Sequence, residues 1–432
     1  MNTQTMIVIL LIAMLVLFML KVPIYVSMSL AGCALMFATG KMRWTLLSQY
    51  LYTGTDSFTL LSIPLFLLAA KLMNSGGITK KLFDFCMKVV GWLPGGLGHV
   101  NVLSSVIFAG MSGTAVSDAG GLGTIEIKAM NDNGFDNEFS CCVTAASSTL
   151  GPIIPPSVPL VVYATVSGAS VGALFMAGIV PGLVMALFMM VLVTVFAVVR
   201  HYPRSKFPTG GEFFKALKEG FLPLMAPVIL LAGIYGGVFT PTESAAIVVL
   251  YSLFLDVAIY RDLTVKKFIR ILKETVRDAV TIALIIAGAT FFGYVATRAK
   301  IPQMILSAMT SVVSSKTAFL IIINIFLLII GCFLETASAI TIVVPLIMPM
   351  LAAYNVNLTQ FGIVMVLNLM IGLLTPPFGL VLFVISKIGN ISIGRFSKAL
   401  VPWMICLIAA LLLITFVPEL SLTLPAALGM SV

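Results

Sequence analysis

Charged residues are scarce in this chain, and so are the side chains on which many enzymes depend. Asp, Glu, Lys and Arg make up 9% of the 432 residues and histidine occurs twice, whereas 60% of the residues are hydrophobic. The mean hydropathy is +1.14, and so little charge cannot cover the surface of a soluble domain. Many windows reach the roughly 18 to 20 apolar residues needed to cross a bilayer. We therefore predict an all-α polytopic membrane protein.

The shortage of histidine also argues against an enzyme. Gly110, Ser112 and Gly113 fit the G-x-S-G nucleophile motif of rhomboid-type intramembrane proteases. A serine nucleophile needs a base on another element, but His99 lies near the start of the same segment and His201 lies in a loop. No Walker-type phosphate loop is present, so ATP hydrolysis is not expected. The six cysteines fit no zinc-site spacing, and we interpret them as small buried residues. We expect no enzymatic activity and no organic cofactor.

The basic residues indicate the topology. Lys and Arg number 25 against 16 acidic residues, a net charge of +9, but they occupy short loops, where they contact lipid headgroups, and do not imply a nucleic-acid partner. If the N-terminus is outside, five of the 25 fall outside and 25 − 5 = 20 fall inside; the five are Lys41, Arg43, Arg298, Lys300 and Lys316. The positive-inside rule then predicts that both termini lie outside.

One long pattern occurs twice. Residues 110–117 and 151–156 correspond to 331–338 and 372–377, with the same offset at both ends (331 − 110 = 372 − 151 = 221) and with Gly110/Gly331, Gly151/Gly372, Ser117/Ser338 and the Pro-Pro pairs at equivalent positions. Repeated interrupted apolar segments in two halves of a membrane chain are typical of secondary transporters. We therefore predict a first repeat at 1–205, a cytoplasmic linker at 206–219 and a second repeat at 220–432. Elements at 1–92 and 220–313 are expected to form a scaffold, and those at 93–199 and 314–417 the part that carries the solute.

Each repeat is expected to contain five transmembrane helices and one re-entrant helical hairpin. The spans are expected at 6–20, 24–40, 57–74, 137–167 and 171–199, and at 220–238, 243–259, 279–297, 359–387 and 395–417. Segments 43–56, 78–92, 262–277 and 301–313 are expected to lie along the interface. Segments 97–130 and 317–353 are expected to be hairpins with non-helical tips at 110–117 and 331–338. An odd number of crossings makes the two repeats inverted in topology.

Broken membrane helices release main-chain carbonyls, which suit Na+, and half-helix N-termini, which suit carboxylates. Each half combines one hairpin tip with one helix break, so we predict two Na+ sites. The first consists of Ser112, Gly113, Thr114, Gly151, Ile154 and Pro156, and the second of Gly331, Glu335, Thr336, Gly372, Thr375 and Phe378. Apolar members would contribute carbonyls only. Substrate contacts are predicted at Ser117, Asp118, Pro155, Ser338 and Pro376.

Several of these residues also have a structural interpretation. Glu335 lies at membrane depth, where burial of a carboxylate is costly and marks a functional site, unless the tip reaches water. Asp118 either lines the first site or caps the outgoing helix. Ser117 and Ser338 either face the substrate or permit close helix packing. Arg298 and Lys300 either attract an anion or anchor to headgroups.

The motifs resemble a known family. The segments 236–245, 146–157 and 368–377, which read GGVFTPTESA, ASSTLGPIIPPS and NLMIGLLTPP, are similar to the large membrane subunit of the tripartite ATP-independent periplasmic (TRAP) transporters. The resemblance covers essentially the whole chain. It implies an ion-transporter-type fold and Na+-coupled import of small organic acids, such as a dicarboxylate, a keto acid or a sialic acid, across the bacterial inner membrane by an elevator mechanism. Both termini would then be periplasmic.

The resemblance also implies partners and ligands. The partners would be a small four-helix membrane subunit, separately encoded because this chain starts at its first span, and a periplasmic substrate-binding protein. The Na+ sites of the family map onto the two sets of residues given above. Family members commonly carry Asp where this chain has Glu335, so the longer side chain changes the ligand geometry. The alternative is a stand-alone Na+-coupled anion transporter or antiporter of the same fold.

Overall fold

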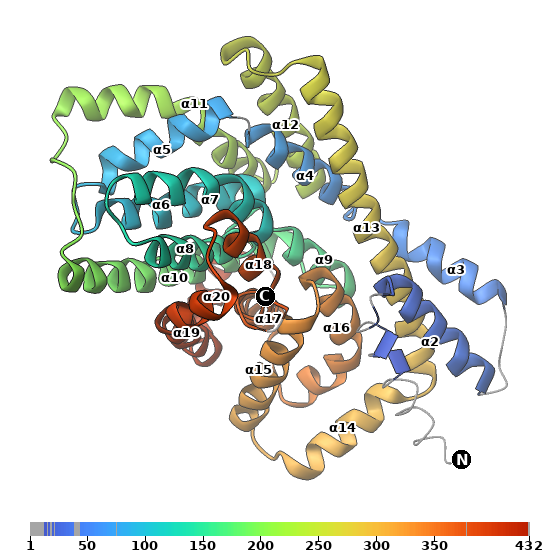
Figure 1. The fold of residues 1–432 in the computed structure, drawn as a ribbon. Coiled ribbons are helices and arrows are strands. Elements are labelled where there is room, and N and C mark those ends of the chain that lie inside the picture. The colour runs from blue at the N-terminus through green and yellow to red at the C-terminus, as the bar shows by residue number, and fades with distance from the viewer. Residues whose placement is uncertain are drawn as a thin grey trace.

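A computed structural model of the chain describes residues 13–14, 16–17, 20, 22–38, 44–74, 76–376 and 378–430, excluding the side chains at 38, 76, 77, 111 and 112. Every regular element within these residues is helical (Figure 1). Most of the expected first span and positions Lys21, Lys41, Arg43 and Pro377 lie outside the described residues. So does the side chain of Ser112.

The first half contains two helices expected at the membrane interface, a hairpin of two helices, an interrupted span and one long helix. Its elements are α2 (Ile24–Ala38), α3 (Trp44–Thr55), α4 (Ser62–Met73), α5 (Gly76–Val90), α6 (Gly96–Ser112), α7 (Ala115–Asp132), α8 (Asn137–Ser147), the 3-10 turn η1 (Ser148–Leu150), α9 (Val158–Ser167) and α10 (Val171–Arg200). The expected hairpin is thus the pair α6 and α7, and the expected broken span is the pair α8 and α9.

The second half follows the same order. Its elements are α11 (Gly210–Tyr235), α12 (Pro241–Phe254) with the π turn η2 (Leu255–Ile259), α13 (Val265–Arg298), α14 (Ile301–Val312), α15 (Lys316–Phe333), α16 (Thr336–Ala353), α17 (Leu358–Gly372), α18 (Leu380–Ile388), α19 (Ile393–Phe416) and α20 (Glu419–Ala427). The helices α7 and α16 start 336 − 115 = 221 residues apart, as do α8 and α17 (358 − 137). The helix bounds therefore follow the sequence offset, while the inverted orientation of the halves stays a prediction.

Seven helices in the described part of the chain are long and apolar enough to cross a membrane: α10, α11, α12 with η2, α13, α15, α16 and α19. The chain is accordingly a multi-pass membrane protein. The hairpin arms α15 and α16 have 18 residues each, or roughly 27 Å at 1.5 Å per residue. Length alone thus allows them to cross, and their re-entrant course remains a prediction.

Two expected boundaries were wrong. Residues 262–277 and 279–297 were expected to be separate, but α13 runs without a break from Val265 to Arg298 because no glycine or proline interrupts 265–287. A continuous rod cannot both cross the membrane and lie flat on it. The linker expected at 206–219 is helical from Gly210 onward, because Thr209 and Glu212 form a reciprocal capping box at the start of α11. The short helix α20 was not expected.

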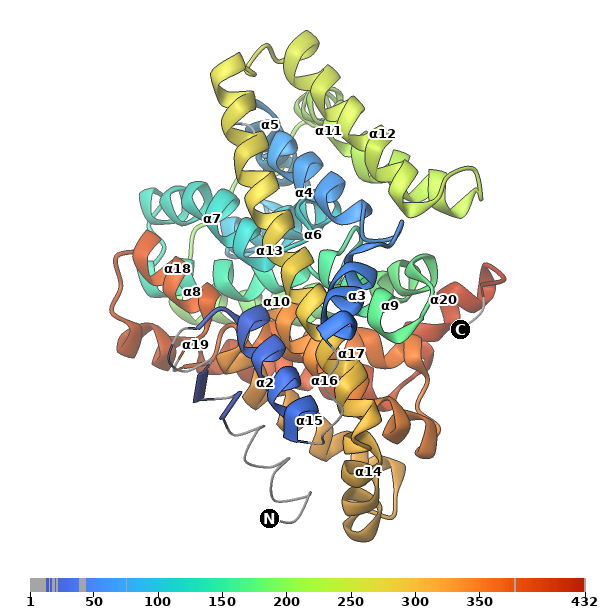
Figure 2. The ribbon, with the colours of Figure 1, turned by 90° about the vertical axis from the view of Figure 1, so that its right-hand side faces the viewer.

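The long helix α13 connects the two halves. It packs against α2, α3 and α4 of the first half and against α16 of the second, and in Figure 2 it runs from near the top of the view down past α3. The helix after each break packs on the hairpin of the other half: α9 packs on α16, and α18 packs on α7. Each hairpin is therefore held in part by the broken helix of the other half.

Candidate functional site

The first hairpin turns at Gly113 and Thr114. Gly113 ends α6 with φ +63°, in the left-handed region that glycine adopts without strain. Thr114 is extended and starts α7, and its hydroxyl accepts a hydrogen bond from the Ser117 amide at 3.4 Å. Gly113 caps the end of α6 and Thr114 caps the start of α7, so the tip is non-helical at the expected position.

The first helix break lies directly against this tip. After η1, residues 151–156 are non-helical and Ser157 caps α9, accepting from the Leu160 amide at 3.2 Å. A Cβ atom built on Gly113 would lie 2.8 Å from the carbonyl oxygen of Pro156, and the Val158 amide donates to the Gly113 carbonyl at 3.4 Å. The structure thus brings Gly113 and Pro156 together, as the sequence predicted, and leaves the main-chain oxygen of Pro156 facing the hairpin.

The second hairpin turns at Leu334 and Glu335. Both residues are extended, with φ −112° and −64°, and they separate α15 from α16. The Glu335 carboxylate caps α16: its Oε2 accepts from the Ser338 amide at 3.3 Å and from the Ser338 hydroxyl at 3.5 Å. The side chain is exposed. Both of these hydrogen bonds engage Oε2, and the Ala337 amide also interacts with the carboxylate.

The second helix break meets the second hairpin through two glycines. A Cβ on Gly372 would lie 2.5 Å from both Cα and the carbonyl carbon of Gly331, so the backbones of α15 and α17 touch there. Thr375 follows, with its hydroxyl donating to the Ile371 carbonyl at 3.0 Å. The rings of Phe333 and Phe378 pack 5.7 Å apart across the same junction. The structure therefore brings Gly331 to Gly372 and Phe333 to Phe378, close in sequence to the tip at Glu335.

Other predicted residues lie elsewhere. Asp118 does not cap α7, because Thr114 does; its carboxylate is buried against α6, where it faces Ser105 without hydrogen-bond geometry. Ser338 is fully buried and bonded to Glu335, which favours a structural role over substrate contact.

Among the remaining predicted residues, Ile154 packs its side chain against Gly182 of α10. Thr336, Gly151 and Pro155 are buried, Ser117 is half-buried and Pro376 is exposed.

Arg298 and Lys300 lie at the junction of α13 and α14. The Arg298 guanidinium donates to the Tyr294 hydroxyl at 3.2 Å, and the Tyr294 ring stacks on Tyr50 of α3 with 4.0 Å between centroids. Both basic side chains are exposed. The aromatic contact favours an anchoring role for Arg298, and neither residue is brought to a hairpin tip by a described contact.

Sequence reasoning missed three buried hydrogen bonds that tie the hairpins to the broken helices, two in the first half and one in the second. In the first half, Ser147 of α8 donates to Asn101 of α6 at 2.7 Å, and Asn101 donates to Thr144 at 2.7 Å. In the second half, Asn368 of α17 donates to Asn324 of α15. Ser147 and Asn368 are 221 residues apart, whereas their partners Asn101 and Asn324 are 324 − 101 = 223 apart, so the bonds lie at similar but not identical places in the two halves. The available signal was a lone asparagine in each apolar helix, a residue that needs a polar partner at membrane depth.

Comparison with known proteins identifies relatives over nearly the whole chain. The family model described as "Tripartite ATP-independent periplasmic transporter, DctM component" matches residues 11–420. The sialic acid TRAP transporter large permease protein SiaM of Vibrio cholerae is 40% identical over 403 residues, which cover 93% of this chain and 94% of that protein. The C4-dicarboxylate TRAP transporter large permease protein DctM of Pseudomonas aeruginosa is 37% identical over 407 residues, which cover 94% and 95%.

A solved structure agrees with the fold. The YdaH transporter of Alcanivorax borkumensis superposes with a TM-score of 0.63 over 86% of this chain and 87% of that chain, at 13% sequence identity. At this identity the likeness concerns the fold alone. It places the helices described here in an arrangement already seen in a membrane transporter.

Proposed function

This chain belongs to the DctM component family of the tripartite ATP-independent periplasmic transporters, and on that premise we propose that it is the large transmembrane subunit of a Na+-coupled importer of a small organic acid. The observation that carries the proposal is that both hairpin tips lie against helix breaks, Gly113 against Pro156 and Gly331 against Gly372. Such junctions supply the main-chain oxygens that bind Na+ in transporters with broken helices.

Na+ would bind at each junction. The donors are hard oxygens: main-chain carbonyls at both breaks, the Thr114 and Thr375 hydroxyls, and the Glu335 carboxylate at the second. Oxygen ligands of this kind suit hard cations. In the described residues, no group of three or more His, Cys, Asp or Glu residues converges on a possible metal site, so the donor set favours an alkali cation bound mainly by backbone.

The solute would be a carboxylate. The N-termini of α7 and α16 lie at the two tips, and helix N-termini carry partial positive charge that attracts anions. The relatives are named for a sialic acid and for C4-dicarboxylates, which share a carboxylate group. We propose this class for the present chain, with the selection among its members made by a periplasmic binding protein.

An elevator mechanism would move one group of helices against another. We assign α2–α5 and α11–α14 to a scaffold, and α6–α10 and α15–α19 to a transport domain. The ion pairs between described residues stay within these groups. Lys71, Lys81 and Lys88 of α4 and α5 pair with acids on α11 and α13, whereas Arg200 and Arg395 pair with Asp136 and Glu138. Sliding between the groups would therefore break no charge pair, which supports the proposal.

The family description as tripartite implies two further proteins. We propose a small membrane subunit and a periplasmic binding protein as partners in the bacterial inner membrane, with both termini of this chain periplasmic. The scaffold has exposed apolar side chains such as Phe214, Phe221 and Leu250. The membrane helices of a partner subunit could pack on an apolar surface of this kind.

Reconstitution tests the proposal. The chain, co-expressed with its small subunit, is placed in liposomes, and uptake of a radiolabelled sialic acid or C4-dicarboxylate is measured with and without an inward Na+ gradient and with and without binding protein. We expect uptake only when both are present. Na+-dependent uptake without binding protein would favour the stand-alone transporter, and uptake unaffected by Na+ would contradict the ion sites.

A further inference from the structure

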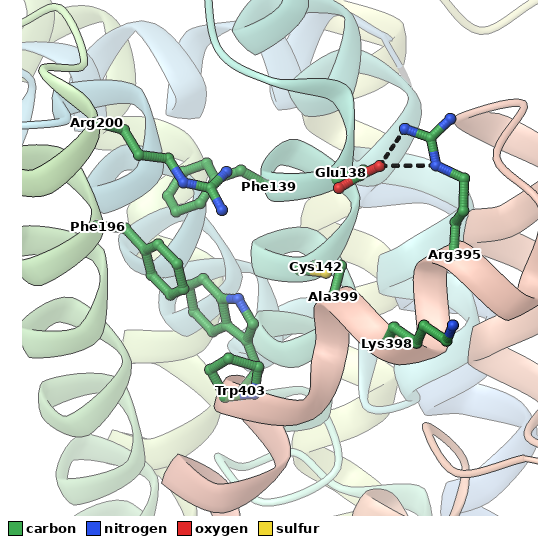
Figure 3. Close-up of a pocket in the computed structure, with 10 residues that line it drawn as sticks. Glu138, Phe139, Cys142, Phe196, Arg200, Arg395, Lys398, Ala399 and Trp403 are labelled. Carbon is green, nitrogen blue, oxygen red and sulfur yellow. Dashed lines mark hydrogen bonds and ion pairs between the residues drawn. The ribbon is translucent and has the colours of Figure 1, made fainter.

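A cavity of about 420 Å³ lies between α8, α10 and α19, away from both hairpin tips. Figure 3 shows Arg200, Glu138, Arg395 and Lys398 around its mouth, with Phe196 and Trp403 on one wall. These side chains come from both halves of the chain. Nothing in the proposed transport mechanism uses them.

The mouth of this cavity is cationic. Arg200 pairs with Asp136 at 2.8 Å and lies over the Phe196 ring at 5.1 Å from its centroid. Arg395 pairs with Glu138. Lys398 makes no ion pair with another described residue. Three basic groups and two acidic ones lie at or beside the mouth, so it has one positive charge in excess.

The wall beneath the charges is aromatic. Trp403 is 1% exposed and stacks on Phe196, with centroids 6.2 Å apart and an interplanar angle of 4°. Phe139 packs against both rings at 5.6 and 5.9 Å. A polar rim above an apolar aromatic wall is the arrangement found where a membrane protein meets the headgroup level.

A second, apolar cavity of about 320 Å³ lies along the same two helices. It is lined by Leu187, Phe188, Val191, Leu192 and Val195 of α10 and by Cys406 of α19. Val195 directly precedes Phe196, and Cys406 is one turn beyond Trp403. From Val195 to Leu187 the groove extends roughly 12 Å at 1.5 Å per residue. Leu187, Val191 and Val195 recur every four residues and are more than half exposed.

We propose that the α10–α19 groove binds one anionic phospholipid of the cytoplasmic leaflet. The phosphate would accept hydrogen bonds from Arg200, Arg395 and Lys398, and one acyl chain would lie along Leu187, Val191 and Val195. Charge at one end and an apolar groove at the other match a lipid and do not match a soluble anion, which has no use for the groove. Basic pockets between membrane helices bind such headgroups. The leaflet assignment depends on the proposed topology; the binding chemistry does not.

The bound lipid would join the two halves of the transport domain. Glu138 and Arg200 belong to the first half, and Arg395, Lys398 and Trp403 belong to the second. A phosphate that accepts hydrogen bonds from Arg200 of the first half and from Arg395 and Lys398 of the second would bridge the two halves at the end where α8 packs on α19.

Quenching of Trp403 measures this binding directly. The chain has three tryptophans, so the Trp44→Phe/Trp92→Phe variant leaves Trp403 as the sole reporter. In nanodiscs of phosphatidylcholine, titration with phosphatidylglycerol brominated on its acyl chains should quench this fluorescence, and brominated phosphatidylcholine should quench it far less. The Arg395→Gln/Lys398→Gln variant should weaken the phosphatidylglycerol effect about 30-fold, or about 2 kcal/mol for two basic groups.

A matched variant controls for lost surface charge. Lys266→Gln/Arg270→Gln removes two exposed basic residues from α13 and should leave the quenching unchanged. Equal quenching by both brominated lipids, an unchanged response in the Arg395/Lys398 variant, or displacement of the lipid by millimolar glycerol phosphate alone would overturn the proposal. The measurement needs no transport, so it stands or fails separately from the Na+-coupled import proposed above.

Discussion

Replacing Gly372 with alanine should push the second hairpin away from the helix break and weaken Na+ binding. The new Cβ would lie 2.5 Å from two backbone atoms of Gly331, whereas carbon atoms pack at about 3.5 to 4.0 Å. The backbones of α15 and α17 must therefore separate by about 1 Å, because neither contact is a flexible side chain that can turn aside. Overpacking of this kind costs about 1–3 kcal/mol.

If the whole cost falls on the Na+-bound state, the half-saturating Na+ concentration rises about 5- to 140-fold. Na+-dependent uptake in proteoliposomes measures this value at saturating loaded binding protein. Gly331→Ala should have a smaller effect, since its nearest backbone atoms lie at 3.1 Å. Gly120→Ala is the control: it lies in the hairpin helix α7 with no atom within 4 Å of a new Cβ, and alanine favours the helix.

The reasoning fails if Gly372→Ala protein, correctly inserted and expressed, shows the Na+ dependence of the unmodified chain. It also fails if Gly120→Ala is as harmful as Gly372→Ala. In that case the effect would come from helix composition and not from the contact between hairpin and break.

Further predictions concern single polar groups. Glu335→Gln keeps an acceptor for the Ser338 amide but removes the charge, so Na+ affinity should fall in uptake assays with little change in melting temperature; Glu335→Ala should also lower the melting temperature, because loss of a helix N-cap costs about 1 kcal/mol. Asn368→Leu should destabilise the protein by about 1–3 kcal/mol in thermal unfolding, since it leaves the side-chain oxygen of Asn324 buried without a donor, and Asn324→Leu/Asn368→Leu should recover part of the loss. The Tyr202 hydrogen bond, followed by Arg200, lowers the pKa of Asp136. A depressed folded-state pKa stabilises above the unfolded value of about 3.9, so Tyr202→Phe should lower the melting temperature near pH 7, and the difference should disappear as the pH falls below the folded-state pKa.

The tips and breaks could be predicted because their signals are local. Glycine and proline weaken helices, and although single prolines such as Pro181 and Pro345 lie inside helices, their clustering indicated the non-helical points at Gly113 and at residues 151–156. The sequence offset also placed the second tip, even though Leu334 and Glu335 are not themselves helix breakers. What the offset could not indicate was that Gly331 would meet Gly372 backbone to backbone, because a close approach depends on how two helices cross.

Two errors had signals that were misread. The basic residues at the start of α13 resembled an interfacial segment, but the absence of glycine or proline over 265–287 was the stronger fact and predicted one helix. Thr209 and Glu212 form a capping box in the sequence that marks the start of α11, within what was read as a linker. The burial of Asp118 and the partners of Asn101 and Asn324 were not readable, since they depend on contacts between distant segments.

The unbroken course of α13 makes one half of the molecule stiffer than the other. Its 34 residues form a rod of about 51 Å, which exceeds the hydrocarbon core by roughly 20 Å. The first half has a non-helical joint between Thr55 and Ser62 at the corresponding place, so it can flex where α13 cannot. Residues 278–298 match the core thickness, and the basic turns before them project as a lever at the end we assign to the cytoplasm. A change in the tilt of α13 relative to the bilayer, such as one imposed by a thinner bilayer, would therefore produce its largest displacement near Lys266.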